Sequence, residues 1–247
     1  MNLSNTKKVT YFLLCGLVVL AGSAFGKINN FMLSEDSATL VSMSSQVREY
    51  EELTGEGGFS AYDVTNERDI SFSQGRLDRT AEGVVFSSKS DDISLEAVFS
   101  KEDGYILVKG MLKNQRGDDR ALIFDYTVGL GGKERVFGYE LDKSASIDGQ
   151  GETENNAIPI AAMSNRESAV ALAIPPSEPR IFGVAGSDKG LTIRFYLGIS
   201  PDTAKFPNEA SFAFIIYPVN ADWAFRSALD KYYSFYPENY TPLPVDG

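Results

Sequence analysis

The sequence predicts an all-β protein, an antiparallel β-sandwich that carries one α-helix near its C-terminus. Apolar and polar residues alternate with a period of two over most of residues 40–217, which is typical of half-buried strands. Turn-forming residues separate these stretches at the spacing of an all-β sandwich. Helical spacing of apolar residues is clear in one place, after residue 222.

The chain begins with the pattern of an export signal, residues 1–26. Lys7 and Lys8 precede an apolar run over residues 9–20, and small residues follow at 21–24. A membrane anchor is the alternative, but the run is shorter than the ~20 residues that span a bilayer. We expect cleavage after Ala24 or Gly26. The mature protein is then exported to the periplasm or outside the cell, with no membrane attachment.

The composition of the mature chain excludes several kinds of site. The 247 residues include 34 Asp and Glu, 23 Lys and Arg, no His and one Cys, Cys15, which lies in the signal. Because the signal also removes Lys7 and Lys8, 34 acidic and 21 basic residues remain, a net charge of −13. A Ser-His-Asp or Cys-His site, a disulfide and the usual zinc or copper sites are excluded. The acidity argues against a nucleic-acid partner.

Five long strands are expected at residues 93–99, 105–113, 121–130, 191–197 and 210–217. Shorter ones are expected at 84–86, 136–137 and 169–174. Residues 144–156 are polar and rich in Gly, Asp, Glu and Asn, so we expect a long loop there. Residues 46–54 fit either a short helix or an edge strand. The sandwich domain therefore covers residues 27–218, with two sheets that bury opposing apolar faces.

The last segment, residues 219–247, is expected to form a helix and a proline-rich tail that acts as a linker. Asp222 is a suitable N-cap and Pro237 ends the helix. The apolar stripe of the helix consists of Phe225, Leu229, Tyr232 and Tyr236. A sandwich whose inner faces are filled does not need this helix for its core. We therefore expect the helix to dock on the outside of one sheet.

Aromatic residues are concentrated in this helix, and two interpretations fit them. The residues are Trp223, Phe225, Tyr232, Tyr233, Phe235 and Tyr236. Stacking on sugars is one interpretation, and docking on a sheet or a neighbouring domain is the favoured one, because an amphipathic stripe normally means burial. Part of the stripe, around Trp223 and Tyr233, is expected to stay exposed and to promote weak self-association.

An acidic segment at residues 148–156 is the candidate for a metal site. It presents oxygen-bearing side chains at alternate positions: Asp148, Gln150, Glu152, Glu154 and Asn156. Calcium takes six to eight oxygen ligands, so a flexible acidic loop suits it, but the spacing is not that of an EF-hand. A solvated acidic loop is favoured over a Ca²⁺ site, because charge runs usually face water.

A second polar group, Asp118, Asp119 and Arg120, lies at a turn between two long strands. It suits the orientation of a sugar hydroxyl. The favoured interpretation is structural: Asp118 caps the turn and Arg120 pairs with a carboxylate. A glycosidase pair of carboxylates or a tyrosine base beside Arg or Lys also fits the composition, but so many acids and tyrosines are present that spacing selects none. The sequence thus assigns no catalytic, cofactor-binding or metal-binding residue.

Three segments resemble a known family. Residues 110–121, with Gly110, Asn114, Gly117 and Arg120, resemble a strand–turn–strand of the galactose-mutarotase-like β-supersandwich. Residues 197–207 resemble the next landmark of the supersandwich that precedes the barrel in large secreted glycoside hydrolases. Residues 223–238 resemble the helix that leaves the sandwich for the catalytic domain. The resemblance extends over residues 39–240 and implies a supersandwich fold and a carbohydrate context.

The chain also departs from that family. No catalytic barrel follows within the 247 residues, and galactose mutarotases use His as the acid, which this chain lacks. Mutarotase activity is therefore excluded. The hypothesis is an exported, non-catalytic, carbohydrate-associated module whose partner is a carbohydrate or a neighbouring catalytic domain. The alternatives are a His-free glycosidase or polysaccharide lyase, and an exported structural or adhesion domain without sugar binding.

Overall fold

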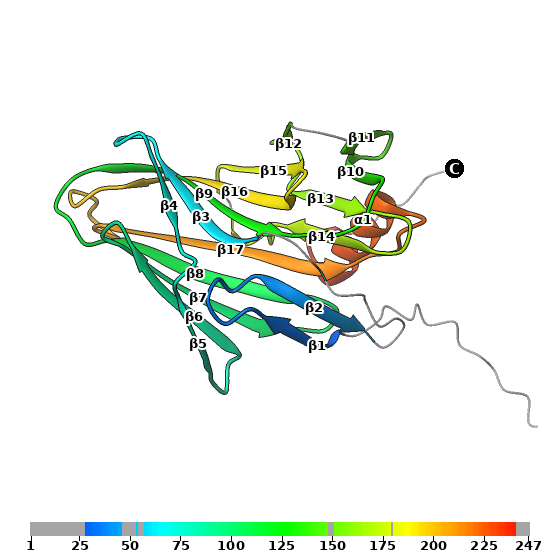
Figure 1. Cartoon of the computed structure of the whole chain (residues 1–247), viewed down its shortest axis with the longest axis horizontal. Coiled ribbons are helices and arrows are strands. Elements are labelled where there is room, and N and C mark those ends of the chain that lie inside the picture. The colour runs from blue at the N-terminus through cyan, green and yellow to red at the C-terminus, as the bar shows by residue number, and fades with distance from the viewer. Residues whose placement is uncertain (1–27, 46–52, 54–56, 148–150, 179, 241–247) are drawn as a thin grey trace, which may run out of the picture.

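The computed structural model describes residues 28–240 apart from 46–52, 54–56, 148–150 and 179. The expected signal and nearly all of the ambiguous segment 46–54 lie outside the described residues. Within that described part the protein is all-β, with antiparallel sheets and one C-terminal helix (Figure 1). The fold class predicted from the alternation is therefore confirmed.

The larger sheet has nine antiparallel strands in the order β11-β10-β13-β14-β17-β8-β7-β6-β5. Its strands in chain order are β5 (Arg76–Arg79), β6 (Val84–Ser90), β7 (Ile93–Lys101), β8 (Ile106–Asn114), β10 (Arg135–Glu140), β11 (Lys143–Ile147), β13 (Ile160–Ser164), β14 (Ala169–Ala173) and β17 (Glu209–Pro218). The chain returns to the centre of this sheet with β17, which pairs with both β8 and β14.

The smaller sheet has six antiparallel strands in the order β12-β15-β16-β9-β3-β4. They are β3 (Gly58–Asp63), β4 (Arg68–Ser71), β9 (Arg120–Val128), β12 (Thr153–Asn155), β15 (Phe182–Ser187) and β16 (Gly190–Ile199). A separate hairpin of β1 (Ile28–Leu33) and β2 (Leu40–Ser45) lies beside the larger sheet (Figure 1). Because β9 pairs with both β16 and β3, it occupies the middle of the smaller sheet.

Every strand expected from the sequence is present, and one expected loop is wrong. Residues 144–156 contain strand β11 and the short edge strand β12, instead of a continuous loop. Strand β12 extends the smaller sheet by pairing with β15. Such polar edge strands carry little apolar alternation because they pair on one side only, so period-two patterning does not detect them.

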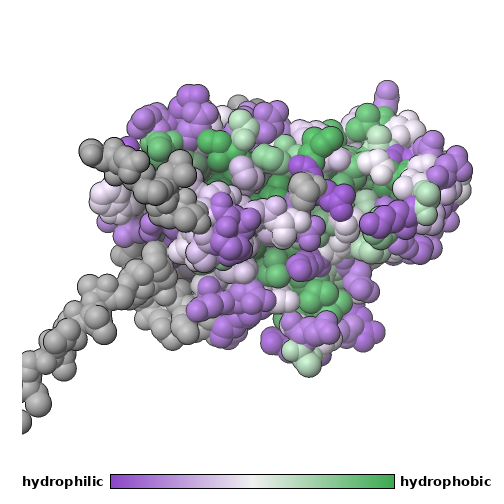
Figure 2. All heavy atoms as spheres, turned by 180° about the vertical axis from the view of Figure 1, so that it is seen from behind, coloured by the Kyte–Doolittle hydropathy of each residue, from purple (hydrophilic) through white to green (hydrophobic). Residues whose placement is uncertain are grey.

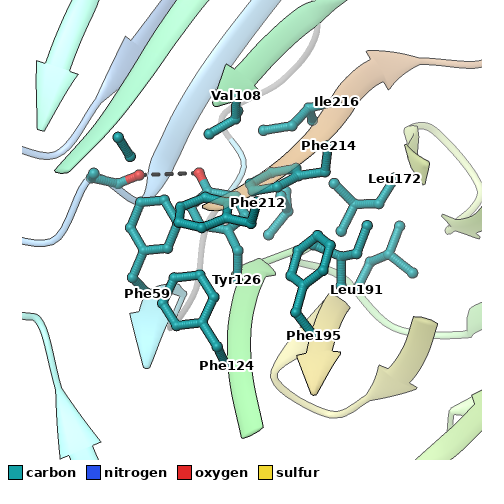
Figure 3. Packing of buried hydrophobic residues seen from close by; sticks show 14 of the residues in the cluster. Phe59, Val108, Phe124, Tyr126, Leu172, Leu191, Phe195, Phe212, Phe214 and Ile216 are labelled. Atoms are coloured by element: carbon teal, nitrogen blue, oxygen red, sulfur yellow. Dashed lines mark hydrogen bonds between the residues drawn. The ribbon is translucent and has the colours of Figure 1, made fainter. Parts of the chain in front are cut away.

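An aromatic core fills the space between the sheets (Figure 3). Phe59, Phe124 and Tyr126 of the smaller sheet contact Phe212 and Phe214 of β17, with ring centroids 4.8–5.9 Å apart in the pairs that join the two sheets. The Tyr126 hydroxyl donates a hydrogen bond of 3.0 Å to the carbonyl of Ala38. That bond satisfies the hydroxyl's polar end inside the apolar core, and burial raises the Tyr126 pKa.

The helix α1 (Ala224–Phe235) packs on the outer face of the larger sheet, as expected (Figure 1). Its buried side chains, Phe225, Ala228 and Tyr232, lie against β13, β14 and the end of β17. The Tyr232 hydroxyl donates a hydrogen bond of 2.6 Å to the carbonyl of Ile174. Leu229 is only half-buried, because it lies at the margin of the apolar cluster that α1 forms with the outer face of the sheet. In the described residues, no helix is long and apolar enough to cross a membrane.

Two expectations for the helix need correction or refinement. Asp222 is not the N-cap: that position is Trp223, with no capping side-chain hydrogen bond. Asn220 organises the helix entry instead, because its side-chain oxygen accepts from the Asp222 amide and its carbonyl accepts from the Ala224 amide. Most of the aromatic residues dock on the sheet, while Trp223 and Tyr233 stay 62% and 42% exposed. Seen from behind, the surface of the protein carries separate hydrophobic patches among hydrophilic residues (Figure 2).

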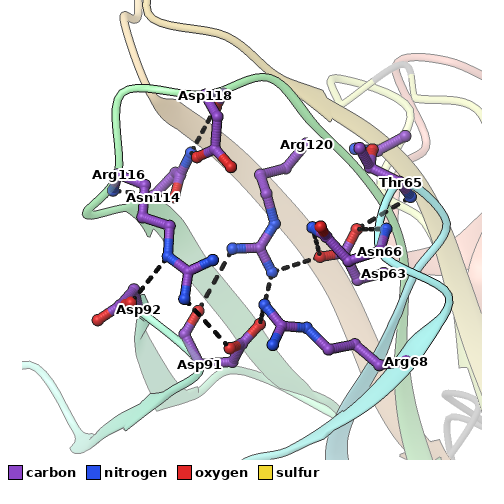
Figure 4. Close-up of polar contacts among 11 residues, drawn as sticks. Asp63, Thr65, Asn66, Arg68, Asp91, Asp92, Asn114, Arg116, Asp118 and Arg120 are labelled. Atoms are coloured by element: carbon purple, nitrogen blue, oxygen red, sulfur yellow. Dashed lines mark hydrogen bonds and ion pairs between the residues drawn. The ribbon is translucent and has the colours of Figure 1, made fainter.

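A cluster of ion pairs joins the two sheets at one end of the sandwich (Figure 4). Arg120 of β9 is fully buried, and its Nη2 lies 2.5 Å from the buried carboxylate of Asp63 and 2.7 Å from that of Asp91. Arg68 also pairs with Asp91. Since Asp63 belongs to the smaller sheet and Asp91 to the β6–β7 turn of the larger one, Arg120 connects the sheets. Its expected pairing with a carboxylate is confirmed.

The acid group at the centre of this cluster is held in its charged form. Burial is the largest influence on Asp63 and by itself raises its pKa. Hydrogen bonds from Asn66 and Arg120 outweigh the burial, so the pKa of Asp63 lies below its ordinary value. A lowered carboxyl pKa stabilises the fold at pH values above the ordinary one, and this stabilisation is lost as pH falls through the lowered value.

The turns that meet at this cluster are built from short polar side chains. Asp91 and Asp92 both have positive φ, the conformation of a two-residue β-hairpin, and arginines neutralise both carboxylates. Asn114, rather than Asp118, organises the β8–β9 turn. Its side chain accepts from the Arg116 amide and donates to the Asp118 carbonyl at 2.7 Å. The Asp118 carboxylate accepts a hydrogen bond of 3.4 Å from the Asn114 side chain instead of capping a backbone amide, so the expectation that Asp118 caps the turn is wrong.

Replacing Arg120 by alanine tests the connection between the sheets. The change leaves two carboxylates without their buried partner, so we expect a loss of about 3–5 kcal/mol of folding free energy, measured by urea denaturation at pH 7. Arg76→Ala is the control, because Arg76 pairs with Asp78 in an exposed ion pair. Its effect should stay within about 1 kcal/mol. Equal losses in the two variants would contradict the assignment.

Replacing Phe225 by alanine tests the docking of the helix. Its ring is buried against the outer face of the sheet, so we expect a loss of about 3–5 kcal/mol. The matched control is Leu229→Ala, which removes a half-buried side chain of the same helix and should cost less than half as much. Thermal denaturation of the two variants gives the comparison. A larger loss for Leu229→Ala would place the docked stripe elsewhere on the helix.

Candidate functional site

The outer face of the smaller sheet collects the polar and aromatic side chains that the core excludes. Along β16, Leu191, Ile193, Phe195 and Leu197 point inward, so the residues between them point outward. The strand register then aligns outward residues of β16, β9 and β3 in rows across the sheet. One row contains Arg194, Asp125 and Ser60, and the next contains Tyr196, Ile123 and Tyr62.

Arg194 is the centre of the polar row. Its Nε and Nη2 donate to the two carboxylate oxygens of Asp125 at 2.9 and 2.8 Å, a bidentate pair between neighbouring strands. Its Nη1 donates to Glu152 at 2.7 Å and to Glu154 at 2.9 Å, and Nη2 also reaches Glu152 at 3.3 Å. Three carboxylates therefore surround one guanidinium.

The edge strand β12 reaches this guanidinium across a glycine. A side-chain carbon at Gly183 of β15 would lie 2.1 Å from Oε1 of Glu154, so the carboxylate occupies the space that glycine leaves. The same Oε1 accepts a hydrogen bond of 2.7 Å from the Tyr196 hydroxyl. Glu154 thereby links the polar row to the aromatic row.

The charge states of this cluster follow from burial and from neighbouring charges. Burial raises the pKa of Asp125, while its bonds to Arg194 oppose that rise. The hydrogen bonds from Arg194 to Asp125 raise the pKa of the guanidinium, which stays charged. Burial, followed by the bond to Glu154, raises the pKa of Tyr196. A tyrosine that acts as a base near neutral pH needs a lowered pKa, so this environment does not favour that role.

The aromatic row is exposed to solvent. Tyr62 and Tyr196 are 38% and 37% exposed, and Ile123 lies between them on β9. The two tyrosines are two strands apart, roughly 10 Å. Ile181 extends the row beyond Tyr196 as an exposed apolar residue. Val64, also exposed and apolar, lies two residues beyond Tyr62 along the chain and bonds to Ala121 of β9. We call these residues together with Arg194, Asp125, Glu152 and Glu154 the tyrosine face.

The structure brings some of the residues selected from sequence to this face and keeps others away. Glu152 and Glu154 face solvent, as expected, but both also form ion pairs with Arg194. Glu154 belongs to strand β12, so the expected loop is wrong at that position. Asn156 is exposed, and Asp148 lies outside the described residues. The described residues contain no group of three His, Cys, Asp or Glu side chains placed to hold a metal. Arg194 occupies the position between these carboxylates where a cation would bind.

The other residues selected from sequence lie elsewhere. Asp118 and Arg120 belong to the cluster that joins the sheets, and the helix aromatics lie on the other sheet. The alternation in β16 places Arg194 and Tyr196 on the polar side of the strand, but no pattern in the sequence selects Asp125 or Tyr62. Alternation shows which face a residue occupies, while the pairing of distant strands decides its neighbours.

A hollow of about 680 Å³ is less suited to ligand chemistry than this face. It lies between the β9–β10 connection and the β13–β14 turn, and Asn165 and Arg166 contribute to its wall. The Asn165 side chain donates to the Gly131 carbonyl and accepts from two amides of its own turn. Arg166 pairs with Glu134. These polar groups already hold the turns together.

Comparison with known proteins supports the fold. No protein-family model matches the sequence, and no curated protein matches it. A solved structure of a polysaccharide lyase is similar, with a TM-score of 0.52 and 8% identity over 85% of this chain and 34% of the lyase. The chain thus spans about a third of that enzyme. At this identity the similarity concerns the fold, a β-sandwich that also occurs in a carbohydrate-active enzyme.

Two further structures are more distant. A 4-α-glucanotransferase from Thermococcus litoralis has a TM-score of 0.38 and 9% identity over 77% of this chain and 37% of the enzyme. The Slr1438 protein from Synechocystis sp. PCC 6803 has a TM-score of 0.43 and 8% identity over 88% of this chain and 98% of that protein. Neither carries an argument, and the finer galactose-mutarotase-like assignment stays a prediction.

Replacing Arg194 by methionine tests the electrostatics of the cluster. The raised pKa of Asp125 means that its contribution to stability declines as pH rises, and Arg194 opposes this effect. Without the guanidinium three carboxylates repel one another. We expect a loss of about 1–3 kcal/mol at pH 7, discounted for partial exposure, that shrinks as pH falls towards 4. Urea denaturation at both pH values measures it. A loss that is independent of pH would contradict the account.

Proposed function

We propose that the protein is an exported, non-catalytic, carbohydrate-associated module that binds a glycan on the tyrosine face. The observation that carries the proposal is the pairing of two exposed tyrosines with an adjacent row of charged hydrogen-bonding groups on the outer face of one sheet. A sugar ring has an apolar face of C–H groups and a rim of hydroxyls. An aromatic ring suits the first, and carboxylates accept hydrogen bonds from the second.

The fold comparison supports the same proposal. The lyase to which 85% of this chain is similar is by its name an enzyme that acts on polysaccharides, and the chain corresponds to about a third of it. A module of this size, attached to or associated with a catalytic domain, is the arrangement that the sequence resemblance implies. The exposed Trp223 and Tyr233 on α1 are the surface that we assign to such a neighbour.

The chemistry of the tyrosine face favours binding over catalysis. Tyr196 has a raised pKa, and Arg194 uses its donors on protein carboxylates, so neither group is free for the roles that a lyase or glycosidase mechanism requires. The enzymatic alternative would need a different arrangement of the same groups. We therefore retain the non-catalytic role as the proposed function.

Removing the tyrosine rings tests the proposal. The variants Tyr62→Ala and Tyr196→Ala delete the two exposed rings, so each should weaken binding of a glycan found on an array at least ten-fold, measured by calorimetry. Tyr233→Ala is the control, since it removes a similarly exposed ring from helix α1, which packs on the other sheet. Unchanged affinity in both sheet variants, with folded protein by circular dichroism, would contradict the proposal.

A further inference from the structure

We infer that the tyrosine face selects glycans without acidic groups and rejects those that carry uronate or sulfate groups. This inference rests on the proposed function and adds the charge class of the ligand. It follows from how the one arginine of the cluster is used and from the charges that surround it. The cluster as a whole has free hydrogen-bond acceptors for a ligand but almost no free donors.

The guanidinium of Arg194 has no donor left for an anionic ligand. A guanidinium carries five N–H groups. One hydrogen bond leaves from Nε, two leave from Nη1 and two from Nη2, and all five end on Asp125, Glu152 and Glu154. An acidic sugar that approached Arg194 would have to displace a protein carboxylate. The residue type that normally captures carboxylates and sulfates is therefore already occupied.

The charge that remains on the face is negative. Three carboxylates pair with one guanidinium, so the cluster keeps a net charge of −2. At the other end of the aromatic row, the exposed Asp69 of β4 lies opposite Tyr62 in the strand register. A ligand stacked on both tyrosines thus has carboxylates at both ends. An anionic sugar there meets like charge, which weakens binding.

The same carboxylates suit hydroxyl groups. Each carboxylate has about four acceptor positions. Glu152 accepts two hydrogen bonds from Arg194, and Glu154 accepts one from Arg194 and one from Tyr196, so lone pairs remain on both. Their side chains are 39% and 27% exposed, within reach of a bound ligand. The hydroxyls of a neutral sugar can donate to these free positions.

Three pairs of hexasaccharides test the inference by calorimetry. The pairs are the hexamers of glucose and glucuronic acid, of galactose and galacturonic acid, and of mannose and mannuronic acid, prepared with the same linkage, because each sugar unit then differs only in the oxidation of C6. In any pair whose neutral member binds, we expect the acidic member to bind at least ten-fold more weakly at low salt. Raising the NaCl concentration should narrow that gap, since salt screens exposed charges.

The variant Glu152→Gln/Glu154→Gln identifies the source of the discrimination. It removes two negative charges from the face, so the difference between neutral and acidic members should fall below three-fold. The matched control is Glu134→Gln/Glu167→Gln, which removes the same charge from another part of the surface and should keep the full difference. If the first variant unfolds early, Glu152→Gln alone, the more exposed position, should reduce the difference by at least half.

The outcomes separate the inference from the function on which it rests. If acidic and neutral members bind alike, or if the face variant keeps the full difference, the inference is wrong while carbohydrate binding stands. Preferred binding of an acidic member has the same meaning. If neither the pairs nor the hexamers of xylose and N-acetylglucosamine bind, the proposed function fails and the inference fails with it.

Discussion

The fold depends on the buried ion pairs that Arg120 makes with Asp63 and Asp91. A charged side chain inside a sandwich is stable only with its partners in place, so this contact admits one position of β9. A shift of one residue in that strand would exchange its inward and outward side chains. The pairing thus keeps Phe124 and Tyr126 in the core and Asp125 on the surface.

The outer faces of the two sheets differ in the side chains that they present. On the larger sheet, small and apolar outward residues such as Ala171 and Ile215 pack against α1. On the smaller sheet, the outward residues include the charged Asp125 and Arg194 and the aromatic Tyr196, and the described helix leaves them uncovered. The smaller sheet, which the helix does not cover, is therefore the one whose outer face presents charged and aromatic side chains to a ligand.

Much of the fold, but little of the site, could be predicted from the sequence. Strands such as β7 and β16 alternate because one face of each is buried, so local patterning reveals them. The edge strand β12 escaped detection because three polar residues carry no period. Arg194 meets Asp125, Glu152 and Glu154 over separations of 40 to 69 residues, and single-sequence reasoning has no signal for such pairing. The paired role of Arg120 was predictable because a turn between strong strands limits what a buried arginine can do.

Hydrogen exchange measured by mass spectrometry with a bound neutral hexasaccharide tests the central claim most directly. The account predicts slower exchange in peptides from β3, β9 and β16, the strands that carry Tyr62, Ile123 and Tyr196, because a ligand on the sheet suppresses local opening there. Peptides from α1 and from β6–β8 should exchange at the same rate with and without the glycan. Protection centred on α1 or on the larger sheet, with β9 and β16 unchanged, would contradict the account.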